Sequence, residues 1–429
     1  MAVVPLGAPQ PVYLIPPAEE IPDDDEDQPK PGPPLAILGP LGFPALHFGA
    51  ASFSHQYNND DHLASFAPVR AVRLALRYGI RSFDTSAYYG PSEIILGAAL
   101  KAIEKEFPRS SYKVTTKCGR YGVTRADFDY SPATLRASVN RSLARLHTDY
   151  LDAVFLHDVE FVCDAVGPSG PGDTAAALHD AKEEYGLSDD QAGMVRGDGD
   201  RIILTAIAEL WNMKDEGRIR SVGISGERAL RLSIGSRRNL IDNSNLGYPL
   251  PTLLRVALLV LHNPPYRALD VVMSYSNLNL QNSSLEAYAP LLKTRAQVTQ
   301  VFNASPLNMG LLTRLAPAWH PARAFPNLLD ATERAVASCE RWEGGLPDVA
   351  LGYSMRHSMA VGMPVAVGLS STKEVHESVK IWRATQQEED SSARECKERE
   401  VVKVFEEGGP RNRIDLGGTP AANVDRAFF

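Results

Sequence analysis

The sequence predicts one (β/α)8 barrel between a disordered N-terminal tail and a C-terminal extension. Short runs of β-type composition alternate with segments of helical period from about residue 45 onward. Such alternation favours a parallel sheet, because each parallel connection needs a crossover, usually a helix. Eight strand runs can be counted, which favours a closed barrel over an open doubly wound sheet. The 429 residues are enough for one such barrel with appendages.

The eight strands are expected where apolar or β-branched runs follow a turn or the end of a helix. They cover residues 45–48, 81–84, 113–117, 151–157, 219–225, 271–274, 297–303 and 365–368. The clearest helices between them cover residues 68–78, 93–105, 131–146 and 202–216. Pro68 suits the first turn of the first helix and Gly79 suits its C-terminal cap, while Ser131 before Pro132 is a cap signal.

Four segments do not belong to a minimal barrel. Residues 1–38 are predicted to be a disordered tail, since they hold ten prolines and seven acids against one base. The barrel then covers 39–387, and a C-terminal extension over 388–429 starts as charged, helix-like sequence. Insertions over 159–200 and 226–268 follow the fourth and fifth strands, at the end where barrels build active sites. These insertions either shape or cover the pocket, or they are inert excursions.

Charge and cysteine content exclude several classes of protein. The formal net charge is −8, of which the acidic tail carries −6, so no basic surplus remains to bind a nucleic acid. The four cysteines form no CxxC pair, which argues against a disulfide framework or a zinc site, and no metal is expected. The longest apolar run, 253–261, contains Arg255 and is too short to span a bilayer. The N-terminus does not resemble a signal peptide, so a cytoplasmic location is expected.

Four polar residues are expected at the carboxyl ends of neighbouring strands. Asp84, Lys117 and His157 end the second, third and fourth strands, and Tyr89 lies in the loop five residues after Asp84. Barrel enzymes build active sites at this end, so the four side chains should meet in one cleft. Each alone has a commoner structural role, as a turn acid, half-buried aromatic, surface charge or core histidine. Their joint placement is what favours catalysis.

Six motifs, in their order and spacing, resemble the aldo-keto reductase family over residues 40–385. The motifs are FDTSAYYG (83–90), VTTKCG (114–119), DAVFLHD (152–158), VGISG (222–226), NASPLNMGLLT (303–313) and VAVGLSSTKEVHESV (365–379). The first is similar to the DxxxxYG signature, the next two to the lysine and histidine strands, and the others to the cofactor-binding segments. YYGPSE and SPLNMGLLT are most similar to the aldose 1-dehydrogenase branch, which includes D-arabinose and L-galactose dehydrogenases.

The resemblance implies an oxidoreductase that passes a hydride from C1 of an aldose to NAD and forms a lactone. It assigns Asp84, Tyr89, Lys117 and His157 to a catalytic tetrad. A free tyrosine titrates at about 10, too high for efficient proton transfer at neutral pH, and an adjacent ammonium lowers that pKa. Asp84 would hold the lysine, and His157 would hydrogen-bond the reacting oxygen. The residues implied to bind the cofactor are Gly49, Ala50, Ser225, Ser274, Ser305, Leu307, Gly368, Ser370 and Ser371.

The cofactor and the function both have alternatives. Relatives that use NADP commonly carry an arginine where this chain has Ser371, so NAD is expected. NADP is the alternative because Lys373 lies two residues further on. The rival functions are an NADPH-dependent aldehyde or ketone reductase and a non-catalytic regulatory subunit of the same fold. The substrate is expected to be a small aldose, while the preferred aldose and the oligomeric state are left open. The residues expected to line the pocket are Phe53, Tyr57, Arg120, Tyr121 and Phe161.

Overall fold

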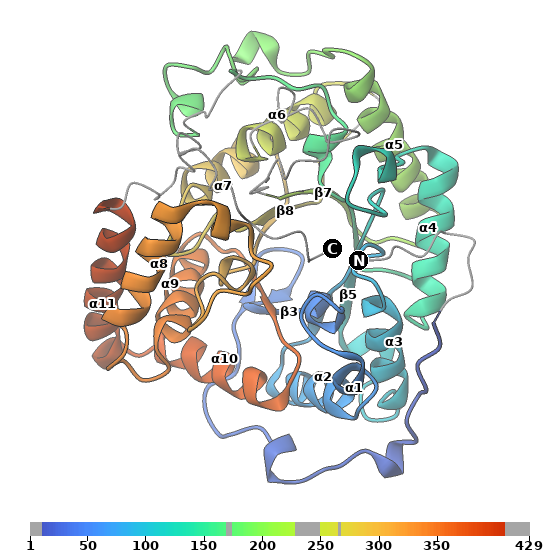
Figure 1. The fold of residues 1–429 in the computed structure, drawn as a ribbon. Helices are drawn as coiled ribbons and strands as arrows, with labels where there is room; N and C mark the ends of the chain where they lie inside the picture. Colours follow the sequence, from blue (N-terminus) through green and yellow to red (C-terminus); the bar gives the residue numbers. More distant parts are fainter. Residues whose placement is uncertain (1–10, 169–173, 228–248, 265–266, 408–429) are drawn as a thin grey trace.

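Eight parallel strands form a closed barrel in the computed structural model, which describes residues 11–168, 174–227, 249–264 and 267–407 (Figure 1). The strands are β3 Leu46–Gly49, β4 Ser82–Asp84, β5 Lys113–Cys118, β6 Ala153–Leu156, β7 Val222–Glu227, β8 Val271–Tyr275, β9 Gln300–Ala304 and β10 Val365–Gly368. They follow one another around the barrel in chain order, and β10 closes it by pairing with both β9 and β3. Each predicted strand overlaps one of these, which confirms the fold class.

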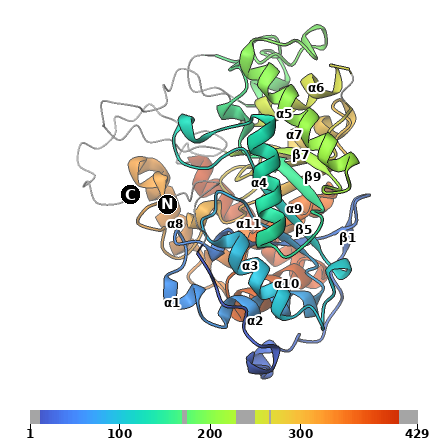
Figure 2. The same cartoon turned by 90° about the vertical axis from the view of Figure 1, so that its right-hand side faces the viewer.

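Helices cover the outside of the barrel (Figures 1 and 2). Within the described residues they are α1 Asp60–Leu63, α2 Ala67–Tyr78, α3 Ser92–Ala102, α4 Pro132–Arg145, α5 Asp198–Asp215, α6 Pro249–Leu261, α7 Leu285–Thr294, α8 Pro326–Ser338, α9 Leu346–Ala360, α10 Thr372–Ala384 and α11 Glu388–Glu407. α2 carries Pro68 in its first turn and ends at Gly79, whose φ of +90° is typical of a helix-ending glycine. The four helices predicted from the sequence overlap α2, α3, α4 and α5.

Side chains fill the interior of the barrel. A short antiparallel hairpin, β1 Ile37–Leu38 with β2 Phe43–Pro44, precedes β3 and lies at the amino end of the barrel. From it the Phe43 ring packs edge-on against Phe302, with 4.8 Å between the ring centroids. Because the interior is packed from this end, a ligand is expected at the carboxyl ends of the strands. The interior cluster consists of Phe43, Ala153, Phe155, Val271, Met273, Phe302, Ala304 and Ala366.

Residues 11–36 form a segment, here called the N-terminal strap, that lies against α2 and α10 at the bottom of Figure 1. The backbone N–H of Lys30 donates to the Tyr78 hydroxyl of α2 at 2.8 Å. Arg383 of α10 donates from Nη1 to the Lys30 carbonyl at 2.9 Å. The prediction of a disordered tail is therefore wrong for residues 11–38, while residues 1–10 lie outside the described residues.

Arginines on α2 bind the acids of the N-terminal strap. Arg70 Nη2 lies 2.7 Å from Oδ2 of Asp27, and Arg77 Nη1 lies 2.7 Å from Oδ1 of Asp23. Asp27 is fully buried, so its carboxylate depends on this pairing. These acids led to the prediction of a disordered tail because an amino-acid composition does not reveal which charges are paired in the fold.

Much of the second predicted insertion is a barrel helix. α6 lies within the predicted insertion 226–268, and its Leu253, Leu254 and Val256 are fully buried. The prediction of an excursion is therefore wrong for 249–261, while residues 228–248 lie outside the described residues. The helix escaped prediction because residues 253–261 are apolar except for Arg255, so the segment has no polar face of the kind that marks a surface helix.

The first predicted insertion packs onto α6. Arg255 donates from Nη1 and Nη2 to the carboxylate of Asp200 at 2.8 and 2.9 Å, and from Nη2 to the carbonyl of Asp164 at 2.8 Å. Both members of the ion pair are buried. This bidentate contact joins the described part of 159–200 to the fifth barrel helix.

The described part of the C-terminal extension also packs on the barrel. α11 lies against α8 and α9, where Arg394 Nη2 lies 2.9 Å from Oδ1 of Asp348 and Phe405 is buried.

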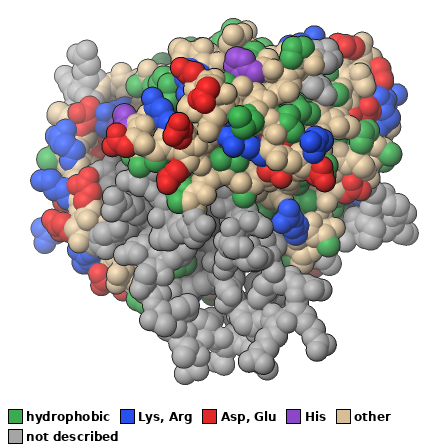
Figure 3. Space-filling model, turned by 90° about the horizontal axis from the view of Figure 1, so that it is seen from above, with side chains coloured by type: hydrophobic (Ala, Val, Ile, Leu, Met, Phe, Trp, Pro, Cys, Tyr) green, Lys and Arg blue, Asp and Glu red, His purple; other side chains and the backbone are tan. Residues whose placement is uncertain are grey.

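The face in Figure 3 carries acidic and basic side chains interspersed over its described part. Across the described ranges, no helix combines the length and apolar character that a membrane span requires.

Candidate active site

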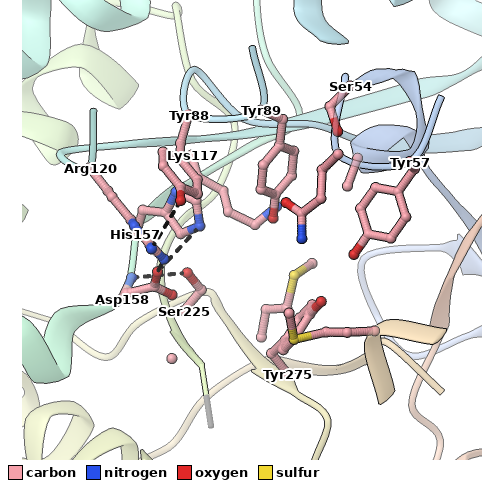
Figure 4. Close-up of a pocket in the computed structure, with 15 residues that line it drawn as sticks. Ser54, Tyr57, Tyr88, Tyr89, Lys117, Arg120, His157, Asp158, Ser225 and Tyr275 are labelled. Carbon is pink, nitrogen blue, oxygen red and sulfur yellow. Dashed lines mark hydrogen bonds and ion pairs between the residues drawn. The ribbon is translucent and has the colours of Figure 1, made fainter. Parts of the chain in front are cut away.

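A cavity of about 220 Å³ lies at the carboxyl ends of the strands (Figure 4). Tyr89, Lys117 and His157 line it, so three of the four predicted catalytic residues meet there, and Asp84 lies behind Lys117. The cavity draws residues from the loops after β3, β4 and β9 and from the ends of β5, β6, β7 and β8. Its other lining residues are Ala51, Ser54, Gln56, Tyr57, Tyr88, Arg120, Asp158, Ser225, Gly226, Met273, Tyr275 and Met309.

Lys117 is fixed between Asp84 and Tyr89. Its Nζ pairs with Oδ2 of Asp84 and donates to the carbonyl of Thr85 at 3.0 Å. The other carboxylate oxygen of Asp84 accepts from the Thr115 hydroxyl at 2.9 Å. The ammonium lies 4.8 Å from the centroid of the Tyr89 ring, and both members of the ion pair are buried. A fixed cation therefore stands beside the phenol.

His157 is held neutral beside Tyr89. Its Nδ1 lies 3.0 Å from the Ser86 hydroxyl, and its ring is nearly perpendicular to the Tyr89 ring, with 5.6 Å between centroids. Burial, reinforced by the charges of Lys117 and Arg120, holds the pKa of His157 well below the usual value of 6.5. A neutral imidazole has one nitrogen that donates and one that accepts a hydrogen bond. It can therefore bind either a reacting hydroxyl group or a carbonyl oxygen.

A second buried histidine supports Asp84 from inside the barrel. His47 on β3 lies 2.6 Å from the Ser82 hydroxyl and 3.3 Å from the hydroxyl of Thr115, which in turn donates to Asp84. Burial lowers the pKa of His47 to about 4, against the opposing attraction of Asp84. The sequence analysis did not single out this residue.

His47 should make the protein less stable in acid. Because its pKa is lower in the folded chain, its contribution is complete above pH 6.5 and is lost as the pH falls towards about 4. The full loss is about 3 kcal/mol, at about 1.4 kcal/mol per pKa unit. Urea unfolding at several pH values should show a shallower loss in His47→Gln than in the wild type. His55→Gln, at an exposed histidine, is the control, and equal slopes in all three proteins would contradict the assignment.

The structure separates two serines predicted to contact the cofactor. Ser225, near the end of β7, lines the cavity and its Oγ accepts from the Asp158 N–H at 3.4 Å. Ser274 is fully buried outside the cavity lining, and its Oγ accepts from Nδ2 of Asn277 at 2.9 Å. Side chains alternate along a strand, so Met273 and Tyr275 of β8 line the cavity in its place.

β3 and β10 both end in a glycine. Gly49 and Gly368 are paired in register, and a Cβ on Gly49 would lie 3.0 Å from the carbonyl oxygen of Val367. A Cβ on Gly368 would meet no atom within 4 Å. The predicted cofactor residue Ala50, directly after β3, is fully buried. The end of β10 at Gly368 therefore leaves room for a ligand to approach the main chain, whereas the end of β3 is closely packed.

The predicted cofactor residues after β10 form the N-terminus of α10. Ser371 is the N-cap, and its Oγ accepts from the Glu374 N–H at 3.4 Å. The Glu374 carboxylate accepts in return from the N–H groups of Ser370 and Ser371 at 2.6 and 3.1 Å. The Glu374 carboxylate is therefore already hydrogen-bonded to the two N–H groups that precede this helix. The S-x-x-E capping spacing is the signal that would have found Glu374 in the sequence.

The loop after β9 holds the last two predicted cofactor residues. Ser305 has a φ of +60° and accepts from the Met309 N–H at 3.0 Å, and Leu307 is partly buried. Met309 lines the cavity, so this loop borders the site. Of the five predicted pocket residues, Tyr57 and Arg120 line the cavity. Those outside the lining are Phe53, Tyr121 and Phe161.

A barrel with an acid, a tyrosine, a lysine and a histidine at successive strand ends defines a class of oxidoreductase. The sequence pattern of the aldo/keto reductase family matches residues 45–398, and the chain belongs to this family. Aldo/keto reductases use nicotinamide cofactors.

The relatives include two sugar dehydrogenases. The chain is 32% identical over 342 residues to D-arabinose 1-dehydrogenase of Saccharomyces cerevisiae, which covers 80% of this chain and 82% of the relative. It is 34% identical over 350 residues to L-galactose dehydrogenase of Arabidopsis thaliana, covering 80% and 86%. The fold matches a glycerol dehydrogenase from Gluconobacter oxydans with a TM-score of 0.53, at 18% identity and with 95% and 100% of the two chains covered. That structural likeness concerns the fold alone.

Proposed function

We propose that this aldo/keto reductase is an NAD-dependent dehydrogenase that oxidises an aldose at C1 to the corresponding lactone. The observation that carries the proposal is the position of Lys117, paired with Asp84 and 4.8 Å from the Tyr89 ring in the cavity that also holds His157. The two sugar dehydrogenases among the relatives support the substrate class. The complete set of four side chains favours an enzyme over the regulatory subunit considered as a rival.

Each of the four side chains has one task in this proposal. Tyr89 accepts the proton of the C1 hydroxyl through its phenol oxygen. The Lys117 ammonium stabilises the negative charge that the oxidation requires on that oxygen, and Asp84 holds the ammonium in place. His157 hydrogen-bonds the C1 oxygen and aligns the sugar. A bound nicotinamide supplies the hydride acceptor.

We propose that a nicotinamide dinucleotide lies along one side of the barrel mouth. The exposed backbone at Gly368 offers an approach for the adenosine half, and Ser225 lines the cavity where a nicotinamide ring would meet the sugar. Ser274 is left out because Asn277 occupies its hydroxyl on the far face of β8. The residues proposed to hold the cofactor are Gly49, Ala50, Ser225, Ser305, Leu307, Gly368, Ser370 and Ser371.

The end of α10 favours NAD over NADP. The Glu374 carboxylate accepts from the N–H groups of Ser370 and Ser371, and its negative charge would repel the 2′-phosphate of NADP at this helix end. Lys373 is exposed, and the nearest acid to its Nζ among the ion pairs of this helix is Glu377, at 3.9 Å. A serine at position 371 supplies no cation for the phosphate.

Ser371→Arg should narrow the preference for NAD. A hydrogen bond from a cation to phosphate contributes about 1.5–3 kcal/mol, or about 10- to 150-fold in relative kcat/KM for NADP. Ser371→Ala removes the same cap without adding a charge, so it serves as the matched control. Rates at equal subsaturating cofactor measure the preference, and a wild-type protein faster with NADP would move the function to the reductase.

A scan of aldoses with NAD, followed by the absorbance of NADH, tests the function directly. Oxidation of D-arabinose or L-galactose supports the dehydrogenase. Reduction of simple aldehydes with NADPH alone supports the reductase, and no turnover in either direction supports the regulatory subunit.

We also propose a cytoplasmic location, because all four cysteines are free thiols, as in a reducing compartment.

A further inference from the structure

An arginine–aspartate pair forms one wall of the cavity beside His157 (Figure 4). Arg120 follows β5, Asp158 follows β6, and Nη1 of the arginine pairs with Oδ2 of the aspartate. The two side chains are 11% and 4% exposed. The same Oδ2 lies 3.6 Å from Nε2 of His157. The pair therefore borders the place that a reacting carbon–oxygen group would occupy.

Its surroundings hold the guanidinium of Arg120 in one orientation. The guanidinium carbon lies 4.0 Å from the centroid of the Tyr88 ring, and Nη2 donates to the Tyr88 hydroxyl at 3.2 Å. Nε donates to the carbonyl of Gly122 at 3.2 Å, and the Phe128 ring lies 5.6 Å away. A planar group fixed in this way presents its donors in set directions.

The backbone at Asp158 turns its carboxylate towards the cavity. Asp158 has φ +59° and ψ +64°, a left-handed conformation that aspartate and asparagine adopt more readily than other residues with a side chain. Its N–H donates to Ser225 Oγ at 3.4 Å, and the preceding carbonyl, of His157, accepts from the Tyr130 hydroxyl at 2.6 Å. Ser225 on β7 and Tyr130 in the segment before α4 thus hold this turn at the cavity wall.

We propose that the Arg120–Asp158 pair binds the hydroxyl group on the carbon next to the reacting carbon. The inference rests on the proposed function and names the feature of the substrate that this site selects. A guanidinium only donates hydrogen bonds and a carboxylate only accepts them, whereas a sugar hydroxyl does both. Because the two charges cancel, the wall suits a neutral sugar better than an anionic one. The site therefore selects aldoses over their 2-deoxy analogues.

The test compares an aldose with its 2-deoxy analogue, using NAD and the full-length enzyme. The wild type should have a kcat/KM about 10- to 150-fold higher for the aldose, the range of a hydrogen bond to a charged group. Asp158→Asn tolerates the left-handed conformation but loses the charge, and it should lower that ratio about fivefold. Arg120→Lys keeps a cation beside Asp158 and loses the planar fork, so it should lower the ratio as well.

Asp200→Asn provides the matched control, because it makes the same change in the buried pair with Arg255 outside the cavity lining. It should lower the melting temperature and leave the substrate ratio unchanged. If folded Asp158→Asn and Arg120→Lys proteins keep the wild-type ratio of kcat/KM for the aldose to that for its 2-deoxy analogue, the inference is wrong but the proposed function stands. A wild type equally fast on both sugars would have the same meaning. A wild type that oxidises no aldose would overturn the proposed function as well. If Asp158→Asn does not fold, Arg120→Lys carries the test.

Discussion

Tyr89→Phe should lower kcat about 10²- to 10⁴-fold while leaving the affinity for NAD nearly unchanged. The substitution removes the hydroxyl that is proposed to accept the proton and keeps the ring, which lies 4.8 Å from Nζ of Lys117 and 5.6 Å from the ring of His157. Rates at saturating aldose and a fluorescence titration with NAD measure the two quantities separately.

Tyr112→Phe is the control for this experiment. Tyr112 directly precedes β5, packs edge-on against Phe83 and is absent from the cavity lining, so loss of its hydroxyl should leave kcat unchanged. If Tyr89→Phe keeps more than about a tenth of the wild-type kcat, another group accepts the proton and the assignment of the four residues is wrong.

Lys117→Met should also lower kcat, by about 10²-fold or more, and should change the pH profile. Without the ammonium, negative charge on the Tyr89 oxygen is less stable, so the rate should keep rising to a higher pH than in the wild type. The variant also leaves the buried carboxylate of Asp84 without its cation, which typically costs about 3–5 kcal/mol of stability. Profiles of kcat against pH, together with thermal denaturation, measure both effects.

The double variant Asp84→Asn/Lys117→Met separates the catalytic loss from the structural one. It removes both charges of the buried pair, so it should regain stability but not activity. Recovery of activity in the double variant would mean that Lys117 acts only by balancing Asp84. An unchanged pH profile in Lys117→Met would contradict its proposed role towards Tyr89.

The sequence predicted the strands well because each is short, apolar and separated from the next by a helix with its own caps. The residues at strand ends follow from the same reasoning, since parallel strands deliver their last residues to one end of the barrel. Which face of a strand a residue occupies was harder to predict. Ser274 and Met273 are neighbours, and a shift of one residue in the strand decides which of them meets the cavity.

Contacts between distant segments explain the other differences. The acids of the N-terminal strap are matched by Arg70 and Arg77, whose pairing is invisible to composition. α6 was predicted to be part of an insertion because its sequence is almost wholly apolar. The structure explains that composition, since the helix is covered by the barrel on one side and by the segment that holds Asp200 on the other. The positive φ of Asp158 could not be predicted either, because it depends on contacts with Ser225 and Tyr130, which are distant in the sequence.

The N-terminal strap has a consequence for the order of folding. It binds α2, which lies between the first and second barrel strands, through Asp23 and Asp27, and α10, which follows the eighth barrel strand, through the Lys30 carbonyl. α2 and α10 flank the seam where β3 meets β10, so we expect the contact with α10 to form together with the pairing of these two strands. Protection of the Lys30 region from hydrogen exchange would therefore report completion of the ring, later than protection of the Asp27 region.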